Sequence, residues 1–120
     1  MSDKTDIEEI LDQFFQAIIN HDMSQVPLAD RVTYSGNLLP DAAEGADAVR
    51  EYLSGSAPFI KSLQILDKVI ESSSAAVLVR YEAINGVQFE GGYFMGFEPG
   101  RIARIRTVFD SRPLMQGGVG

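Results

Sequence analysis

The last third of the chain, residues 75–112, limits the possible folds more than any other stretch. It holds three extended runs separated by two turn signals. Asn85-Gly86 is the strongest short-range signal for a β-hairpin, and it predicts a type I′ turn in which both central residues take positive φ. Pro99-Gly100 predicts the second turn, because proline presets its own φ and glycine frees the next residue. The three runs therefore predict one antiparallel meander.

An amphipathic helix is predicted over Asp6–Asn20, where it would cover one face of this meander. The large apolar residues recur at the spacing of a single helical face. They are Ile7, Ile10, Leu11, Phe14, Phe15, Ile18 and Ile19. Acidic residues crowd the first turns, where they suit the helix dipole.

The segments between this helix and the meander predict a short helix, a strand, a loop and another helix. Ser24–Ala29 is predicted as the second helix, and Arg31–Tyr34, with β-branched residues at its centre, as a strand. Gly36–Gly45 is a predicted loop, and Asp47–Leu53 predicts the third helix. The pattern of Phe59–Glu71 fits a helix almost as well as a strand. We choose strand, because a short serine turn joins it directly to the meander.

Composition bounds the class of protein. The 120 residues predict one domain, 1–120, with one core. The net charge of −7 argues against nucleic acid and anionic membranes as partners. Without cysteine there is no thiolate site, and with His21 as the single histidine no metal ligand set is predicted. The polar start of the chain and the lack of long apolar runs favour a cytoplasmic protein.

The order of predicted elements (α-α-β-α-β-β-β-β) resembles the nuclear transport factor 2-like superfamily. That superfamily includes SnoaL-like cyclases, ketosteroid isomerases and limonene-epoxide hydrolases. The resemblance rests on residues 14–22 (FFQAIINHD), 45–53 (GADAVREYL) and 100–106 (GRIARIR) before Phe109-Asp110. It implies an α+β, cystatin-like cone: three N-terminal helices packed on a curved antiparallel sheet, around a pocket. The superfamily contains both enzymes and non-enzymes, so the fold does not decide the function.

The resemblance also suggests which catalytic residues to look for. The isomerase base would fall near Ser35, its oxyanion tyrosine at Phe14 and its protonated aspartate at Gly92, so ketosteroid isomerase chemistry is not expected.

The epoxide hydrolase motif fits better. Its Arg-x-Asp pair is similar to Arg80-x-Glu82, while its second aspartate falls at Thr107. If the resemblance sets the face of the strand, Arg80 and Glu82 point into the cone as candidate catalytic residues. An ion pair or a solvated face is the alternative explanation of this spacing.

The predicted pocket has a polar floor made by the candidate catalytic pair and an apolar wall. The wall residues are Phe14, Phe15, Ile18, Phe94 and Phe109. The face set by the resemblance also turns Glu90 and Thr107 inward. Tyr34 and Tyr52 are expected either to offer pocket hydroxyls or to sit at the edge of the core.

Two functions remain open at this stage. The first is a cone that binds a small apolar molecule. As an enzyme, such a cone would be a SnoaL-like isomerase, cyclase or hydrolase that works by acid/base chemistry without a cofactor. The second is a non-catalytic, dimeric binding or interaction module of the same fold.

A homodimer is predicted through the outer face of the sheet, because the residues assigned to that face form an apolar patch rimmed by arginines. They are Val77, Val79, Tyr81, Tyr93, Met95 and Phe97, with Arg104 and Arg106. The alternative is that the two faces are reversed.

Overall fold

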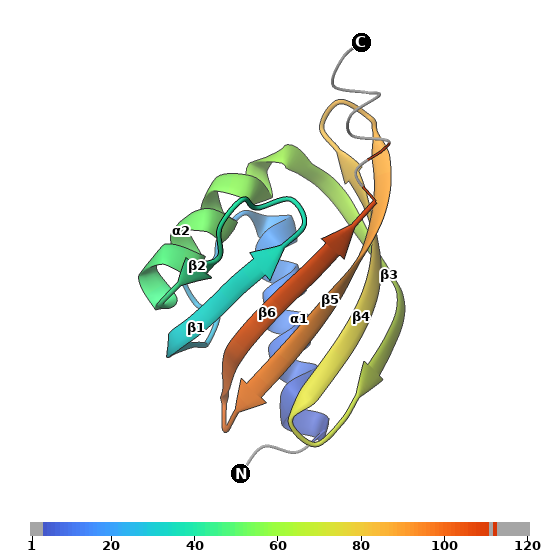
Figure 1. Cartoon of the computed structure of the whole chain (residues 1–120). Coiled ribbons are helices and arrows are strands. Elements are labelled where there is room, and N and C mark those ends of the chain that lie inside the picture. The colour runs from blue at the N-terminus through green and yellow to red at the C-terminus, as the bar shows by residue number, and fades with distance from the viewer. Residues whose placement is uncertain (1–3, 111, 113–120) are drawn as a thin grey trace.

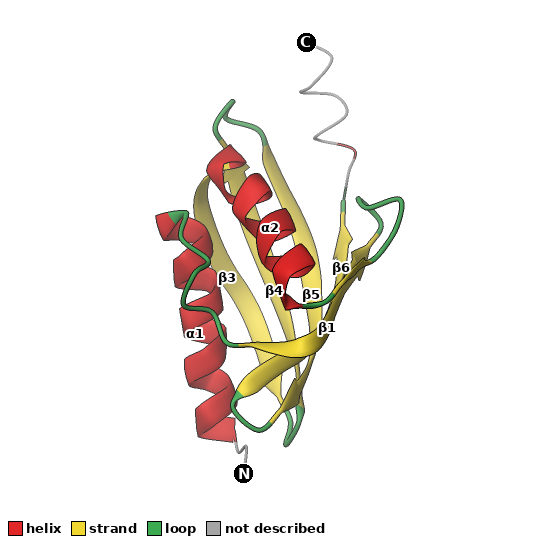
Figure 2. Ribbon diagram, turned by 90° about the vertical axis from the view of Figure 1, so that its left-hand side faces the viewer, coloured by secondary structure: helices red, strands yellow, loops and turns green. Residues whose placement is uncertain are grey.

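The computed structural model describes residues 4–110 and 112 and has an α+β fold (Figure 1). Its six strands form one curved sheet in the order β2-β1-β6-β5-β4-β3. Two α-helices lie on the same side of this sheet (Figure 2). We call the side that they cover the inner face and the opposite side the outer face. The elements are α1 (Lys4–Asn20), β1 (Leu28–Gly36), β2 (Ala43–Glu44), α2 (Ala46–Ser56), the 3₁₀ turn η1 (Ala57–Phe59), β3 (Ile60–Ile70), β4 (Ser74–Ala83), β5 (Gln88–Glu98) and β6 (Arg101–Phe109).

The first helix, α1, confirms the prediction from its apolar spacing. Every residue of the predicted stripe is buried except the last, Ile19. The helix ends in a Schellman motif, in which the amides of His21 and Asp22 bond to the carbonyls of Ile18 and Ala17 at 3.2 and 3.0 Å. His21 takes the left-handed conformation that this motif requires, with φ 57°. The helix therefore stops abruptly, and the chain turns toward β1.

The predicted helix over Ser24–Ala29 is wrong, and the chain crosses this region as a turn that leads into β1. Pro27 has no N–H to give to a helix, and six residues are too few to sustain one. The carbonyls of this segment instead accept hydrogen bonds from donors elsewhere in the chain. Arg50 on α2 donates from Nη1 to the carbonyls of Met23 and Val26, and the carbonyl of Pro27 accepts a bond from β6.

The sheet is mixed, which corrects the expectation of an antiparallel one. Strand β1, which confirms and extends the prediction over Arg31–Tyr34, pairs in parallel with β6 and antiparallel with the short β2. The Asn37 side chain fastens the end of this parallel pair. Its Nδ2 donates to the carbonyl of Phe109 at 2.7 Å, and its Oδ1 accepts from the amide of Phe109 at 2.8 Å.

The remaining strands follow the predicted meander. Strand β3 confirms the choice of strand over helix for Phe59–Glu71, and α2 confirms the helix predicted at Asp47–Leu53. Between β5 and β6, Gly100 takes φ 77° after Pro99, as in a type II turn. The hairpin at Asn85-Gly86 forms, but its turn is not type I′. Gly86 has positive φ and Asn85 does not. The loop is one residue longer than a type I′ loop, and the amide of Ala83 closes it by donating to the carbonyl of Val87 at 2.8 Å.

Burial along the strands shows that the faces expected for β4 and β5 were reversed. The residues expected outside are all buried on the inner face: Val77, Val79, Tyr81, Tyr93, Met95 and Phe97. Arg80 and Phe94 are exposed on the outer face, and Glu82 and Glu90 are half-buried there. The physical reason is desolvation. Facing Arg80 and Glu82 toward the helices would bury two charges, while the other side of the same strand is uniformly apolar.

Candidate ligand-binding cavity

A cavity of about 220 Å³ lies between the inner face of the sheet and the segment α2–η1. Its mouth includes Leu38, from the loop after β1, and Phe59, from η1, whose side chains are both exposed. Its interior is almost entirely aromatic and aliphatic. The lining residues are Ile18, Tyr34, Leu38, Tyr52, Leu53, Ser56, Ala57, Phe59, Ile60, Tyr81, Ala83, Phe89, Tyr93 and Phe109.

Tyrosine hydroxyls supply most of the polarity of this cavity. All four tyrosines of the chain line it, three of them from strands β1, β4 and β5. The hydroxyls of Tyr81 and Tyr93 lie 2.6 Å apart and share a hydrogen bond. The hydroxyl of Tyr34 lies beside those of Tyr93 and Thr107. Thr107 Oγ1 donates to the carbonyl of Ser35 at 3.3 Å. We call Tyr34, Tyr81, Tyr93 and Thr107 the hydroxyl cluster.

Burial keeps these phenols protonated. Desolvation raises the pKa of Tyr34, Tyr81 and Tyr93 above that of free tyrosine, because a phenolate would lose its water without gaining a cation. Tyr52, which is only half-buried, has its pKa raised by the same cause. The cluster therefore offers neutral hydroxyls and no phenolate at physiological pH.

Aromatic rings pack around Phe109 at the end of β6. Its ring centroid lies 5.7 to 5.9 Å from those of Tyr81, Phe89 and Tyr93. The ring rests directly on Gly91: a Cβ atom there would lie 2.5 Å from Cε1 and 2.8 Å from Cγ of Phe109, closer than real contacts allow. Because Gly91 has no side chain, the Phe109 ring can pack against the sheet there and form one wall of the cavity.

No charged side chain lines the cavity among the residues that the structure describes. Within the same residues, no three histidine or carboxylate side chains gather closely enough to hold a metal ion. The arrangement can enclose an apolar molecule and hydrogen-bond one polar atom of it. It holds no imidazole or carboxylate to exchange a proton with that molecule.

Comparison with models of protein families identifies the family of this chain. The model of one family, a domain of unknown function (DUF4904), matches residues 2–118. The chain belongs to this family. No curated protein matches the chain in a sequence comparison.

Solved structures show that this DUF4904 protein has the fold of the nuclear transport factor 2-like superfamily. A steroid delta-isomerase from Pseudomonas aeruginosa is 14% identical with a TM-score of 0.80, covering 96% of this chain and 87% of its own. A protein proposed to be a SnoaL-like polyketide cyclase from Jannaschia sp. CCS1 is 11% identical with a TM-score of 0.79, covering 95% and 92%. An NTF2-like protein of unknown function from Cytophaga hutchinsonii is 17% identical with a TM-score of 0.75, covering 90% and 93%. At these identities the likeness shows the fold alone. Along the described part of the DUF4904 chain, no helix has the length and apolar character needed to cross a membrane.

Four residues predicted for the pocket do line the cavity of the DUF4904 protein: Ile18, Tyr34, Tyr52 and Phe109. Thr107 is buried behind them in the hydroxyl cluster. Phe14 and Phe15 are in the core instead, where their rings pack against the ring of Tyr93 at 5.7 and 5.2 Å. Sequence reasoning missed Tyr81, Tyr93 and Phe89. The apolar side of β4 and β5 was the signal that could have found them.

The other predicted site residues lie outside the cavity. Arg80 pairs with Glu90 across β4 and β5, with Nε 2.9 Å from Oε2. Glu82 lies 3.6 Å from the Nζ atom of Lys61. This is the ion-pair alternative named above, on a solvated face. The predicted inward orientation of Arg80, Glu82, Glu90 and Phe94 is therefore wrong, and a catalytic role for Arg80 and Glu82 stays a prediction that the cavity does not support.

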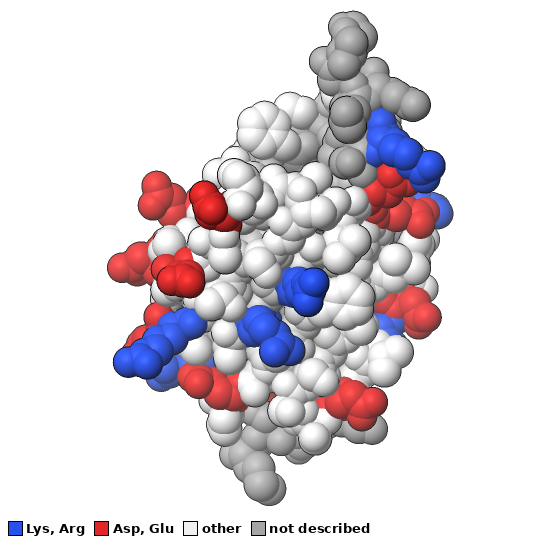
Figure 3. Space-filling view, viewed as in Figure 1, with Lys and Arg blue, Asp and Glu red and all other residues white. Residues whose placement is uncertain are grey.

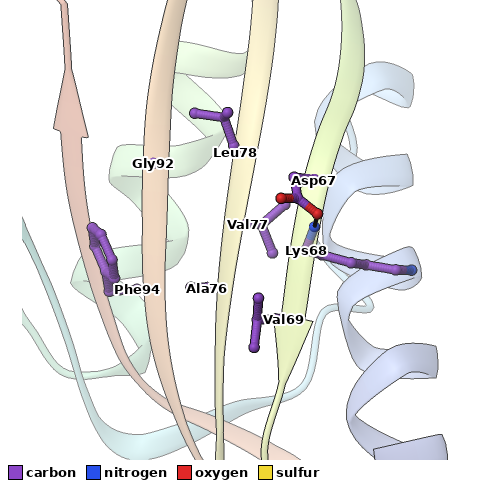
Figure 4. Close-up of a pocket in the computed structure, with 8 residues that line it drawn as sticks. All are labelled: Asp67, Lys68, Val69, Ala76, Val77, Leu78, Gly92 and Phe94. Carbon is purple, nitrogen blue, oxygen red and sulfur yellow. Dashed lines mark hydrogen bonds between the residues drawn. The ribbon is translucent and has the colours of Figure 1, made fainter.

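The outer face carries its own apolar centre. A shallow depression of about 170 Å³ runs across β3, β4 and β5 there, between the side chains of Val69, Leu78 and Phe94 (Figure 4). These three side chains and Val108 on β6 are 42 to 57% exposed. Figure 3 shows basic side chains within a largely uncharged centre of this face and acidic side chains toward its edges. We call Val69, Leu78, Phe94 and Val108 the outer apolar patch.

Proposed function

We propose that this protein binds a small, mostly apolar molecule in the cavity on its inner face. The observation that carries the proposal is the hydroxyl cluster at the buried end of an otherwise apolar cavity. A core built only for stability would gain more from packed hydrocarbon than from three phenol hydroxyls beside open space. Apolar walls with a few convergent polar groups are typical of ligand sites.

Binding is a better-supported function than acid/base catalysis. An acid/base enzyme needs an ionisable group within hydrogen-bond reach of the substrate. The charged residues predicted for that role point to solvent on the other face, and burial raises the pKa of the cavity tyrosines away from neutrality. The steroid isomerase and the polyketide cyclase have a similar fold, but their activities belong to those proteins.

Filling the cavity tests the proposal. Ala83→Leu adds three carbon atoms at the inner face of β4, where Ala83 lines the cavity. We expect indole, used as a probe in ligand-observed NMR, to bind the unmodified protein and to bind this variant at least tenfold more weakly. Ala76→Leu is the matched control, since Ala76 belongs to the same strand but lies on the outer face. Binding that survives Ala83→Leu unchanged, or is absent from the unmodified protein, contradicts the proposal.

We further propose that the outer apolar patch joins two copies of the chain in a homodimer. This differs from the interface expected from sequence, whose six apolar residues are in the core. Gly92 and Gly96 flank Phe94 on the outer side of β5, so the ring of Phe94 packs over Gly92 and the guanidinium of Arg104 packs over Gly96. An exposed apolar centre suits face-to-face packing of two sheets.

Charge complementarity favours a second copy as the occupant. On the outer face, Arg104 and Arg106 project from β6, while Asp67 and Glu82 lie on β3 and β4. A two-fold axis along the strands would place β6 of one copy opposite the β3–β4 side of the other, so Arg104 and Arg106 of one copy would meet Asp67 and Glu82 of the other.

Sedimentation equilibrium at micromolar concentration tests the dimer. The expected mass is twice the 13.1 kDa of one chain. Phe94→Glu should give a 13.1 kDa species, because it places a charge at the centre of the patch on each copy. Ile84→Glu is the control, since Ile84 is 63% exposed at the hairpin between β4 and β5, off the patch. A monomeric unmodified protein, or a dimer indifferent to Phe94→Glu, refutes this interface.

A further inference from the structure

We propose that the cavity selects a ligand with an aromatic ring over a saturated ligand of the same volume. This inference rests on the proposed function and adds the chemical class of the ligand.

Aromatic rings are concentrated in the wall of the cavity. Seven of its fourteen lining residues carry one, whereas aromatic residues make up 9% of the chain. A wall that has only to be apolar does not need this choice, because aliphatic side chains also exclude water. The composition of the wall therefore points to a contact that rings make and aliphatic chains do not.

The rings that line the interior form two groups. In the first, which joins β1 to α2, the ring centroids of Tyr34 and Tyr52 lie 5.0 Å apart. The second group belongs to β4, β5 and β6, and its members are Tyr81, Phe89, Tyr93 and Phe109. Within the described part of the chain, no ring pair joins one group to the other. Both groups line the same cavity, so a ring placed in it can contact both.

An aromatic ligand can make pairs there that a saturated ligand cannot. The faces of an aromatic ring are electronegative and its edge is electropositive, so two rings attract each other edge to face. The second group already packs in this way, because the rings of Phe89 and Tyr93 meet that of Phe109 at 67° and 88°. A saturated ring has no electronegative face to accept such an edge. Each pair that the ligand gains should raise its affinity about two- to twelvefold beyond the effect of buried area.

The mouth of the cavity offers one more ring. The side chain of Phe59 lines the cavity and is 62% exposed, so much of its apolar surface is left in water. A ligand that reaches the mouth would cover part of this surface. An aromatic ligand would gain a ring pair there as well as the burial.

Toluene and cyclohexane form a matched pair of probes, because they have nearly the same volume and only toluene is aromatic. A cavity of about 150 Å³ accommodates benzene, so the present one, at about 220 Å³, has room for either probe. Cyclohexane is the less soluble of the two in water, so the hydrophobic effect alone favours its binding. We expect the opposite order: toluene should bind the full chain at least threefold more tightly, measured by displacement of indole in ligand-observed NMR.

Phe89→Leu and Phe97→Leu are matched variants that locate the preference. Both residues lie on the inner face of β5 and are 8% exposed, but Phe89 lines the cavity and Phe97 does not. Phe89→Leu should lower the ratio of the toluene and cyclohexane affinities at least twofold, and Phe97→Leu should leave this ratio unchanged. Cyclohexane binding by Phe89→Leu shows that the variant keeps its fold and its cavity. The comparison in the unmodified protein decides the proposal if that variant does not fold.

The remaining outcomes separate this inference from the proposed function. If indole binds but cyclohexane displaces it as well as toluene does or better, or if neither probe displaces it, the preference for an aromatic ring is overturned and the proposed function stands. An equal loss of the preference in both variants also overturns it, because the lining ring would then not be its source. If indole itself does not bind, the proposed function fails, and this inference fails with it.

Discussion

Gly91 and Gly92 are neighbours on β5 that face opposite sides of the sheet, and a methyl group at each should have opposite effects. In Gly91→Ala, the new Cβ would overlap Cδ1 of Phe109 and lie 2.5 Å from its Cε1, so the ring must move by more than about 1 Å to restore an ordinary contact. Overpacking of this kind costs about 1–3 kcal/mol of unfolding free energy. Phe109 lines the cavity, so a displaced ring should narrow it and weaken indole binding as well.

Gly92→Ala is the matched control for this substitution. Its Cβ would lie 3.5 Å from Cε2 of Phe94 on the outer face, an ordinary contact. Alanine also lowers the conformational entropy of the unfolded chain, so we expect the free energy of unfolding to rise by about 0.4–1 kcal/mol. Urea unfolding of both variants at one protein concentration, compared at constant m-value, measures the difference. A larger loss for Gly92→Ala than for Gly91→Ala would refute the assignment of the faces, and two neutral variants would refute the packing of Phe109 on Gly91.

Two further predictions concern the buried phenols and the segment before β1. The pKa of the cavity tyrosines in the folded state lies above their unfolded value near 10. Above that pH the folded state therefore binds more protons than the unfolded state. The free energy of unfolding should then fall by up to about 1.4 kcal/mol per pH unit for each buried tyrosine. Phenolate absorbance should therefore rise together with the loss of circular dichroism on alkaline titration; a phenolate formed near pH 10 in an intact fold contradicts this. Arg50→Met should lower the free energy of unfolding by about 2–3 kcal/mol, because the carbonyls of Met23 and Val26 lose a charged donor. Arg101→Met is the control, because it removes an exposed ion pair with Glu98 whose N–O distance is 4.0 Å, and it should change the free energy of unfolding by less than about 1 kcal/mol. Equal losses of unfolding free energy in the two variants would contradict the role of Arg50.

Sequence patterns predicted the elements of this fold well and their environments less well. The alternation in β4 sorts its side chains into two sets, but it does not say which set meets the helices. The resemblance to epoxide hydrolases favoured the set with Arg80 and Glu82, while desolvation favours the set with Val79 and Tyr81. The energetic argument was available in the sequence and agrees with the structure.

Other features depend on partners that are distant in the chain. Nothing local in Ser24–Ala29 shows that Arg50 will supply hydrogen bonds to its carbonyls. Likewise, the hydroxyl cluster joins β1, β4, β5 and β6, and its members are separated by up to 73 positions from Tyr34 to Thr107. Single-sequence periodicity reports on neighbours within a few residues, so it could nominate Tyr34 and Thr107 but could not bring them together.

The parallel pairing of β1 with β6 also has a consequence for the order of folding. Asn37 and Phe109, which hold this pair together, are 72 residues apart in the chain. Contacts of such long separation form late, because the entropy of closing the loop has to be lost first. During synthesis β6 emerges after every other described strand. Until then, the helices have only part of the sheet to cover, and Thr107 is not yet beside Tyr34. The step that completes the sheet is therefore the same step that creates the polar end of the cavity, so a nascent chain cannot capture a ligand there before β6 has been made.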